Sequence, residues 1–99
     1  MIAVIFEVIP NSDGKNSYFE IAELLKPALA EVDGFISVER FQSLSNKNKY
    51  LSLSFWTDEA AISQWKTNTQ HQWAQTKGKQ KLFNQFNIRV AHIVRDYGA

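Results

Sequence analysis

The sequence of 99 residues contains no cysteine. This absence excludes disulfide bonds, thiolate metal sites, iron–sulfur clusters and cysteine nucleophiles. An excess of one charge sign is also lacking, and the net charge of +1 gives no electrostatic reason to expect nucleic acid or an anionic membrane as a partner. Two histidines on different predicted elements, without an acidic motif at ligand spacing, make a poor metal site.

Long hydrophobic runs are missing as well. The apolar run at residues 2–9 ends at Pro10, is too short to span a bilayer and lacks the basic leader of a signal peptide, so we expect a cytoplasmic protein. What is present is 44% hydrophobic and 21% charged residues, which is typical of an ordinary globular protein. The length predicts one domain over residues 1–99.

The first predicted element is a strand over residues 1–9, which are rich in β-branched side chains. Apolar residues occur on both faces of this strand, so both faces should be covered. Alternation groups the side chains as Ile2, Val4, Phe6 and Val8 on one face and Ala3, Ile5, Glu7 and Ile9 on the other.

A helix is predicted from Ser17, because Ser17 and Glu20 match a capping box and apolar residues then recur at helical spacing up to Val32. Pro27 lies off the apolar stripe, on the side expected to face solvent. Gly34 is suited to a left-handed cap at the end of this helix.

The second half of the chain predicts a hairpin, a helical region and a closing strand. Residues 35–44 and 50–56 predict strands, with Phe35 and Phe41 on one face and Val38 on the other, and with Trp56 at the sheet edge. Helical patterning then runs to about residue 84, with Thr57 as its cap. The elements end with a strand predicted over residues 88–97.

The order strand, helix, strand, strand, helix, strand predicts an α+β fold. Its compact form is a ferredoxin-like βαββαβ sandwich, in which a four-stranded antiparallel sheet carries both helices on one face. The other face of the sheet is apolar and bare, which indicates a partner-binding surface. A second copy placed by two-fold symmetry covers it economically, so we expect an obligate homodimer.

Candidate chemistry gathers in the helical region. His71 shares a helical stripe with the small residues Ala74 and Gly78, and Trp65 lies six residues before it. If the chain bends between them, the imidazole and the indole border one cavity suited to a flat aromatic ligand, with His71 as hydrogen-bond or proton-transfer group. The plainer interpretation is that Trp65 is a core residue and that His71 bonds a carbonyl.

Other candidates are weaker as catalytic groups. Packing is favoured over catalysis for Trp73, and a structural role is favoured for His92. No serine lies in a nucleophile-elbow pattern. The candidate catalytic residues are therefore His71 and Trp65, and the candidate substrate contacts are Glu7, Trp73, Gly78 and Phe83.

Three segments carry a family resemblance: GFISVERFQS, LSLSFWTDEAAISQWKTNTQHQWAQTKGK and FNIRVAHIVRDYG. With them the chain, from Ile2 to Gly98, resembles the antibiotic biosynthesis monooxygenase domain of the dimeric α/β-barrel superfamily. The resemblance implies a ferredoxin-like protomer that pairs through its sheets into a dimeric α/β barrel, and a pocket between sheet and helices. In some members it also implies cofactor-independent oxidation of polycyclic phenols or quinols by molecular oxygen.

The haem-degrading branch of this superfamily is similar in fold, but its haem-binding residues differ from the residues at the matching positions here. There a tryptophan and a haem-ligating histidine lie ten residues apart, with an asparagine in the first strand. Here the position ten residues after Trp65 is Gln75, and the first strand offers Glu7. We therefore expect no cofactor, and haem binding through His71 is the third hypothesis.

Two other hypotheses come before it. In the first, the protein is a monooxygenase without a cofactor that oxidises a small aromatic phenol or quinol, with His71 as base or hydrogen-bond partner and Trp65 as a wall of the pocket. In the second, it is a non-catalytic dimer that binds a small aromatic molecule or none.

Overall fold

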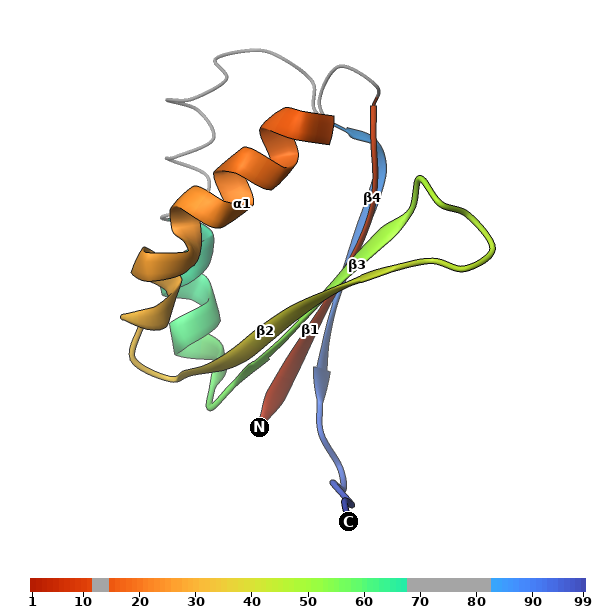
Figure 1. The fold of residues 1–99 in the computed structure, drawn as a ribbon. Coiled ribbons are helices and arrows are strands. Elements are labelled where there is room, and N and C mark those ends of the chain that lie inside the picture. Colours follow the sequence, from red (N-terminus) through yellow and green to blue (C-terminus); the bar gives the residue numbers. More distant parts are fainter. Residues whose placement is uncertain (12–14, 68–82) are drawn as a thin grey trace.

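A computed structural model describes residues 1–11, 15–67 and 83–99 of the chain. Figure 1 shows a layer of strands with helices packed on one side of it. The labelled elements are β1 (Ile2–Pro10), α1 (Lys15–Ala30), β2 (Phe35–Gln42), β3 (Tyr50–Trp56) and β4 (Phe83–His92). A second helical segment, residues 59–67, follows β3.

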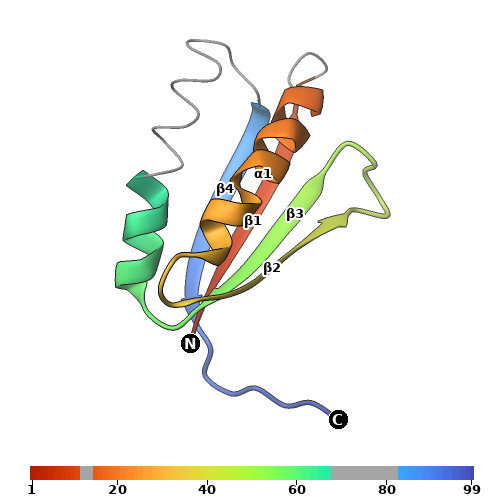
Figure 2. The same ribbon diagram turned by 60° about the vertical axis from the view of Figure 1, so that its left-hand side comes forward.

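The strands form one sheet in the order β2-β3-β1-β4. Every neighbouring pair is antiparallel, and β1 lies between β3 and β4. Helix α1 crosses one face of this sheet, with the second helical segment beside it (Figure 2). The predicted ferredoxin-like α+β arrangement is therefore confirmed.

The core lies between the sheet and the helices. Ile2 packs there with Leu29 of α1, Trp56 of β3 and Ala61 of the second helical segment, and all four are buried. At the other end of β1, Val8 is 1% exposed. Burying an aliphatic side chain of this size stabilises the fold by about 1.5–3 kcal/mol. The predicted grouping of Ile2 with Val8 on one face is confirmed, and the structure shows that this face packs against the helices.

Helix α1 presents its apolar stripe to this core. Ile21, Leu25 and Leu29 are buried and four residues apart, so they share one face of the helix. Pro27 is exposed inside the helix, on the solvent side as predicted. Gly34 follows with a φ of 97°, and its predicted left-handed conformation is confirmed.

The predicted face of Phe35 is wrong. A register shift between Phe35 and Ser37 interrupts the pairing of β2 with β3. Because such a bulge breaks the alternation of side chains, Phe35 lies on the same side as Val38 and not with Phe41. Its ring meets the indole of Trp56 edge-on, with 5.3 Å between ring centroids.

The predicted edge position of Trp56 is also wrong. Strand β3 lies between β2 and β1, so Trp56 is internal to the sheet and only 2% exposed. Its indole Nε1 donates a hydrogen bond of 2.9 Å to Oγ of Ser54, which satisfies the buried donor.

The cap of the second helical segment is one residue later than predicted. Asp58 directly precedes residues 59–67, and its Oδ1 accepts a hydrogen bond of 3.0 Å from the backbone N–H of Ala61. This is the bond that an N-cap carboxylate makes to a free amide of the first turn. Asp58, not Thr57, is therefore the cap.

The last strand lies earlier than residues 88–97. Strand β4 pairs with the whole of β1, from Pro10 opposite Phe83 to Ile2 opposite His92. Beyond β4, Ile93 N donates one more hydrogen bond of 3.0 Å to Met1 O. The partner strand therefore sets both ends of β4, and the helical prediction for residues 83 and 84 is wrong. Among the described residues, no helix is long and apolar enough to span a membrane.

Candidate active site on the helix side of the sheet

The helix side of the sheet carries an apolar strip on β4. The register places Phe86, Ile88 and Val90 opposite Val8, Phe6 and Val4, the inward residues of β1. Paired residues of antiparallel strands project to the same side, and the rings of Phe6 and Phe86 lie 6.2 Å apart. These three β4 side chains, named here the β4 strip, are nevertheless 49–62% exposed. Apolar surface on the side of the helices suits contact with a small organic molecule.

Trp65 lies on the second helical segment and faces the same layer. It packs against the cluster of Ile2 and Trp56 and against the cluster of Ile21 and Leu25. It is only partly buried, so part of its ring remains accessible. Trp65, the predicted wall of the pocket, is thus packed against the core without being completely buried.

Three predicted site residues, His71, Trp73 and Gly78, lie outside the described residues. The predicted meeting of Trp65 with His71 therefore stays a prediction. Phe83 is the first residue of β4 and stands opposite Pro10, at the end of the sheet where β1 finishes.

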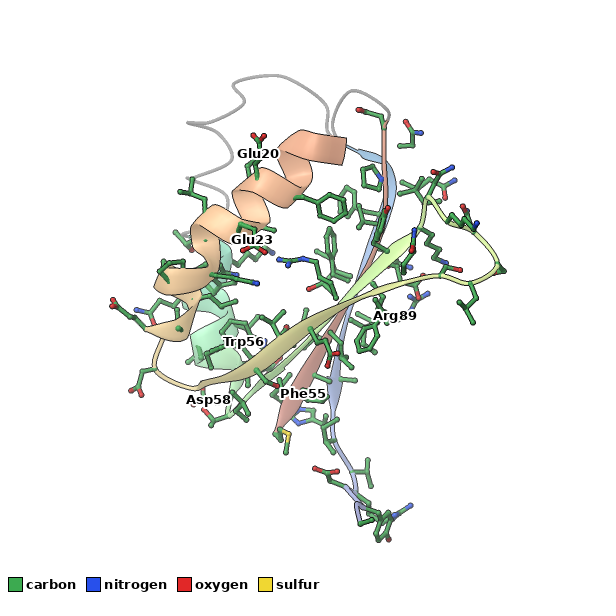
Figure 3. The ribbon with its side chains drawn as sticks, in the orientation of Figure 1. Glu20, Glu23, Phe55, Trp56, Asp58 and Arg89 are labelled. Atoms are coloured by element: carbon green, nitrogen blue, oxygen red, sulfur yellow. The ribbon has the colours of Figure 1, made fainter. Side chains whose placement is uncertain are left out.

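Glu7 lies on the other side of the sheet from Trp65. Its carboxylate oxygens lie 3.2 Å from Nζ of Lys49 and 3.4 Å from a guanidinium nitrogen of Arg89. Figure 3 shows Arg89 on the side of the sheet away from the helices, whereas Trp56 points towards them. Glu7 is therefore not brought together with Trp65, because neighbouring residues of a strand point to opposite faces.

The open side of the sheet has a hollow of its own. It encloses about 280 Å³ at the end where the β2–β3 hairpin begins, and Glu7, Phe41, Lys49 and Leu51 are among its walls. Exposed ion pairs of this kind contribute little stability, about 0–1 kcal/mol each. The hollow is lined both by apolar side chains, Phe41 and Leu51, and by charged side chains, Glu7 and Lys49.

Arg40 is a residue of the helix side that sequence reasoning missed. On β2 it stands opposite Ser52 of β3, whose partner on β1 is the inward-facing Phe6. Its Nε is buried and has no hydrogen-bond partner. Arg40 is two residues from the inward-facing Val38, so strand alternation alone could have drawn attention to a charged residue at an inward position.

Within residues 1–11, 15–67 and 83–99, no three histidine, aspartate or glutamate side chains lie close enough to hold a metal ion together. On the helix side, the register instead places Arg40 opposite Ser52, and both side chains can donate hydrogen bonds.

Curated relatives share this sequence over most of its length. A jasmonate monooxygenase ABM from Pyricularia oryzae is 42% identical over 93 residues, which cover 94% of this chain and 43% of that protein. The chain thus spans less than half of that relative. The uncharacterised protein YqjZ from Bacillus subtilis is 31% identical over 94% of this chain and 79% of its own length.

One solved structure shares the fold of this chain, and one family model matches its sequence. Rv0793 from Mycobacterium tuberculosis superposes with a TM-score of 0.79 over 98% of both chains at 13% identity, which supports the fold alone. The model of the antibiotic biosynthesis monooxygenase family matches residues 1–77. With that match over most of its length, the chain belongs to the antibiotic biosynthesis monooxygenase family.

Proposed function

We propose that this protein is a monooxygenase that oxidises a small aromatic phenol or quinol with molecular oxygen and without a cofactor. The observation that carries the proposal is the 42% identity, across 94% of the chain, to a protein named a monooxygenase. The β4 strip and the partly exposed Trp65 support it, because both offer apolar contact area on the helix side of the sheet.

The chemistry needs an electron-rich substrate and a base. His71 removes a proton from the substrate, and the resulting anion transfers one electron to oxygen. The two radicals combine to a peroxide, which takes up the proton from His71 and then loses water to leave a carbonyl group. One oxygen atom stays in the product, and the other leaves as water with two hydrogens of the substrate, namely the proton first removed by the base and the hydrogen of the oxidised carbon. Trp65 orients the rings and helps to exclude water.

His71→Ala is the decisive variant. Removing a general base slows a reaction by about 10²-fold or more, so oxygen uptake with an anthrone should fall by that factor. His92→Ala is the matched control, because His92 is exposed at the end of β4, and it should keep the full rate. A rate unchanged by His71→Ala would dismiss this residue as the base, and no oxygen uptake by the wild type with any quinol or anthrone would dismiss the function.

The second candidate function is a non-catalytic binder of a small aromatic molecule. It is favoured by the packing of Trp65 against two core clusters, which is how a structural tryptophan packs. Ligand-induced quenching of tryptophan fluorescence without oxygen uptake would support it. Trp73, Gly78 and Phe83 remain proposed substrate contacts in either case. Haem binding would show as a shifted Soret band in a haem titration.

We further propose that the protein is a homodimer that pairs through the open side of the sheet. Ile5, Leu51, Leu53 and Phe55 lie on this side, each only partly buried, and Phe41 beside them is 43% exposed. A second copy would cover this apolar surface by two-fold symmetry. It would also enclose the hollow beside Glu7.

A charge at the centre of this face tests the dimer. Leu53 stands between Ile5 and Glu39 in the sheet, so Leu53→Asp would place an unpaired carboxylate in the interface. Sedimentation at micromolar concentration should then give a monomer. Leu44→Asp is the control, because Leu44 is fully exposed in the β2–β3 connection, and it should leave the dimer intact. A wild-type monomer would contradict the proposal.

A further inference from the structure

We propose that Arg40 binds a carboxylate of the substrate, so that the substrate class is an aromatic phenol or quinol that bears a carboxylate group. The proposal rests on the proposed function for the reaction. The carboxylate site itself concerns binding alone, and ligand binding can be measured without turnover.

The first observation is the position of Arg40. Its neighbour two residues earlier, Val38, packs against the buried cluster between sheet and helices. Alternation along β2 therefore directs Arg40 into the same layer. Its cross-strand partner is Ser52, which directs a guanidinium and a hydroxyl to one side of the sheet.

The second observation concerns one nitrogen of the guanidinium, Nε. The Nε of Arg40 is buried and lacks a hydrogen-bond partner, although Arg40 as a whole is partly exposed. Among the described residues, the carboxylates in ion pairs are those of Glu7 and Glu23, and both pair with other cations. A buried charged donor without a partner is destabilising, and such groups are retained where a ligand or a catalytic role uses them.

The chemistry of these two donors favours a carboxylate. A guanidinium is a planar fork that binds both oxygens of a carboxylate at once, and Ser52 adds a hydroxyl donor next to it. One cation balances the single charge of a carboxylate. A phosphate monoester carries up to two charges and calls for further cations.

The rest of the substrate has an apolar path across the sheet. The cross-strand row that begins with Arg40 and Ser52 continues with Phe6 on β1 and Ile88 on β4. Three strand spacings, about 14 Å in total, separate its two ends. The row is charged at β2 and apolar at β4, which matches an aromatic ligand with its carboxylate at one end and its ring system at the other.

The test compares a ligand pair that differs only in charge. Binding of 6-hydroxy-2-naphthoate and of its uncharged primary amide is measured without oxygen, by quenching of the tryptophan fluorescence. The wild type should prefer the carboxylate by about tenfold or more, as expected for a charge-assisted bidentate contact. In Arg40→Gln the ratio should fall to within about twofold, while Arg40→Lys, which keeps the charge but loses the fork, should lie between.

Arg95→Gln is the matched control, because Arg95 is exposed beyond β4 and should leave the ratio unchanged. Equal or absent binding of the two ligands by the wild type, or an undiminished ratio in Arg40→Gln, would overturn the proposal. So would tighter binding of 2-naphthyl phosphate than of the carboxylate. If Arg40→Gln does not fold, Arg40→Lys decides the matter. A carboxylate preference without any oxygen uptake would refute the proposed reaction and leave the carboxylate site in place.

Discussion

Gly34 joins the end of α1 to β2 and touches the start of the helical segment that carries Trp65. Its φ of 97° lies in the left-handed region, where an L side chain is strained. A Cβ at this position would lie 2.7 Å from Oγ1 of Thr57 and 2.9 Å from Cβ of Ala61. The Thr57 side chain can rotate away, but the Cβ of Ala61 is fixed to the helix. Gly34→Ala should therefore destabilise the fold through both strain and overpacking.

The two contributions can be added from their usual sizes. A left-handed alanine costs about 1–2 kcal/mol, and overpacking in a well-packed region costs about 1–3 kcal/mol. We expect the free energy of unfolding to fall by about 2–5 kcal/mol. Since 1 kcal/mol shifts the midpoint of a domain of this size by about 4–8 °C, the melting temperature should fall by at least about 8 °C.

Urea denaturation followed by circular dichroism measures this loss directly, with all variants at one protein concentration because a dimer makes stability depend on it. Gly98→Ala is the matched control, because no heavy atom lies within 4 Å of the added methyl, and it should stay within about 0.5 kcal/mol of the wild type. A Gly34→Ala protein as stable as the control would refute the reasoning, since neither the strain nor the close approach to Ala61 would then exist.

Two further predictions concern the residues around this junction. Asp58→Ala removes the carboxylate that caps the second helical segment and should lower the free energy of unfolding by about 1 kcal/mol, whereas Asp58→Asn should keep most of it; equal losses in both urea titrations would contradict a capping role. Trp56→Phe deletes the indole donor and leaves Oγ of Ser54 buried without it, so thermal denaturation should show a loss of about 1–3 kcal/mol. That loss should shrink in a Trp56→Phe, Ser54→Ala double variant, and an undiminished loss would show that ring volume alone accounts for it.

Local sequence patterns were sufficient to predict those features whose conformation depends on residues nearby in the sequence. The grouping of Ile2, Val4, Phe6 and Val8 on one face of β1 followed from alternation, because the period of two needs only the strand itself. The burial of Ile21, Leu25 and Leu29 and the exposed position of Pro27 followed from helical spacing in the same way, whereas Leu24 and Ala28, predicted in the same apolar stripe, are exposed. Gly34 was predictable as a left-handed cap because few other residues accept that conformation.

The site was accessible to sequence reasoning only in part. Trp65 was correctly singled out as a residue of the layer between helices and sheet, and its proposed partner His71 lies outside the described residues. Glu7 was grouped with the substrate contacts, although strand alternation put it on the face opposite Ile2. Arg40 was missed, although alternation from Val38 already put it at an inward position; that its Nε is buried without a partner is known only from the structure.

The sequence by itself determined the type and order of the described elements, because periodicity and turn residues act over short distances, and three of its segments carried the family resemblance. Only the tertiary structure decided the ends of β4, which its pairing with β1 sets, and the face of Phe35, which a bulge against β3 reverses. It also decided that Trp56 is internal and that the Nε of Arg40 is buried without a partner. The physical reason is the same in each case: register and burial are properties of pairs of segments, and no single segment contains them.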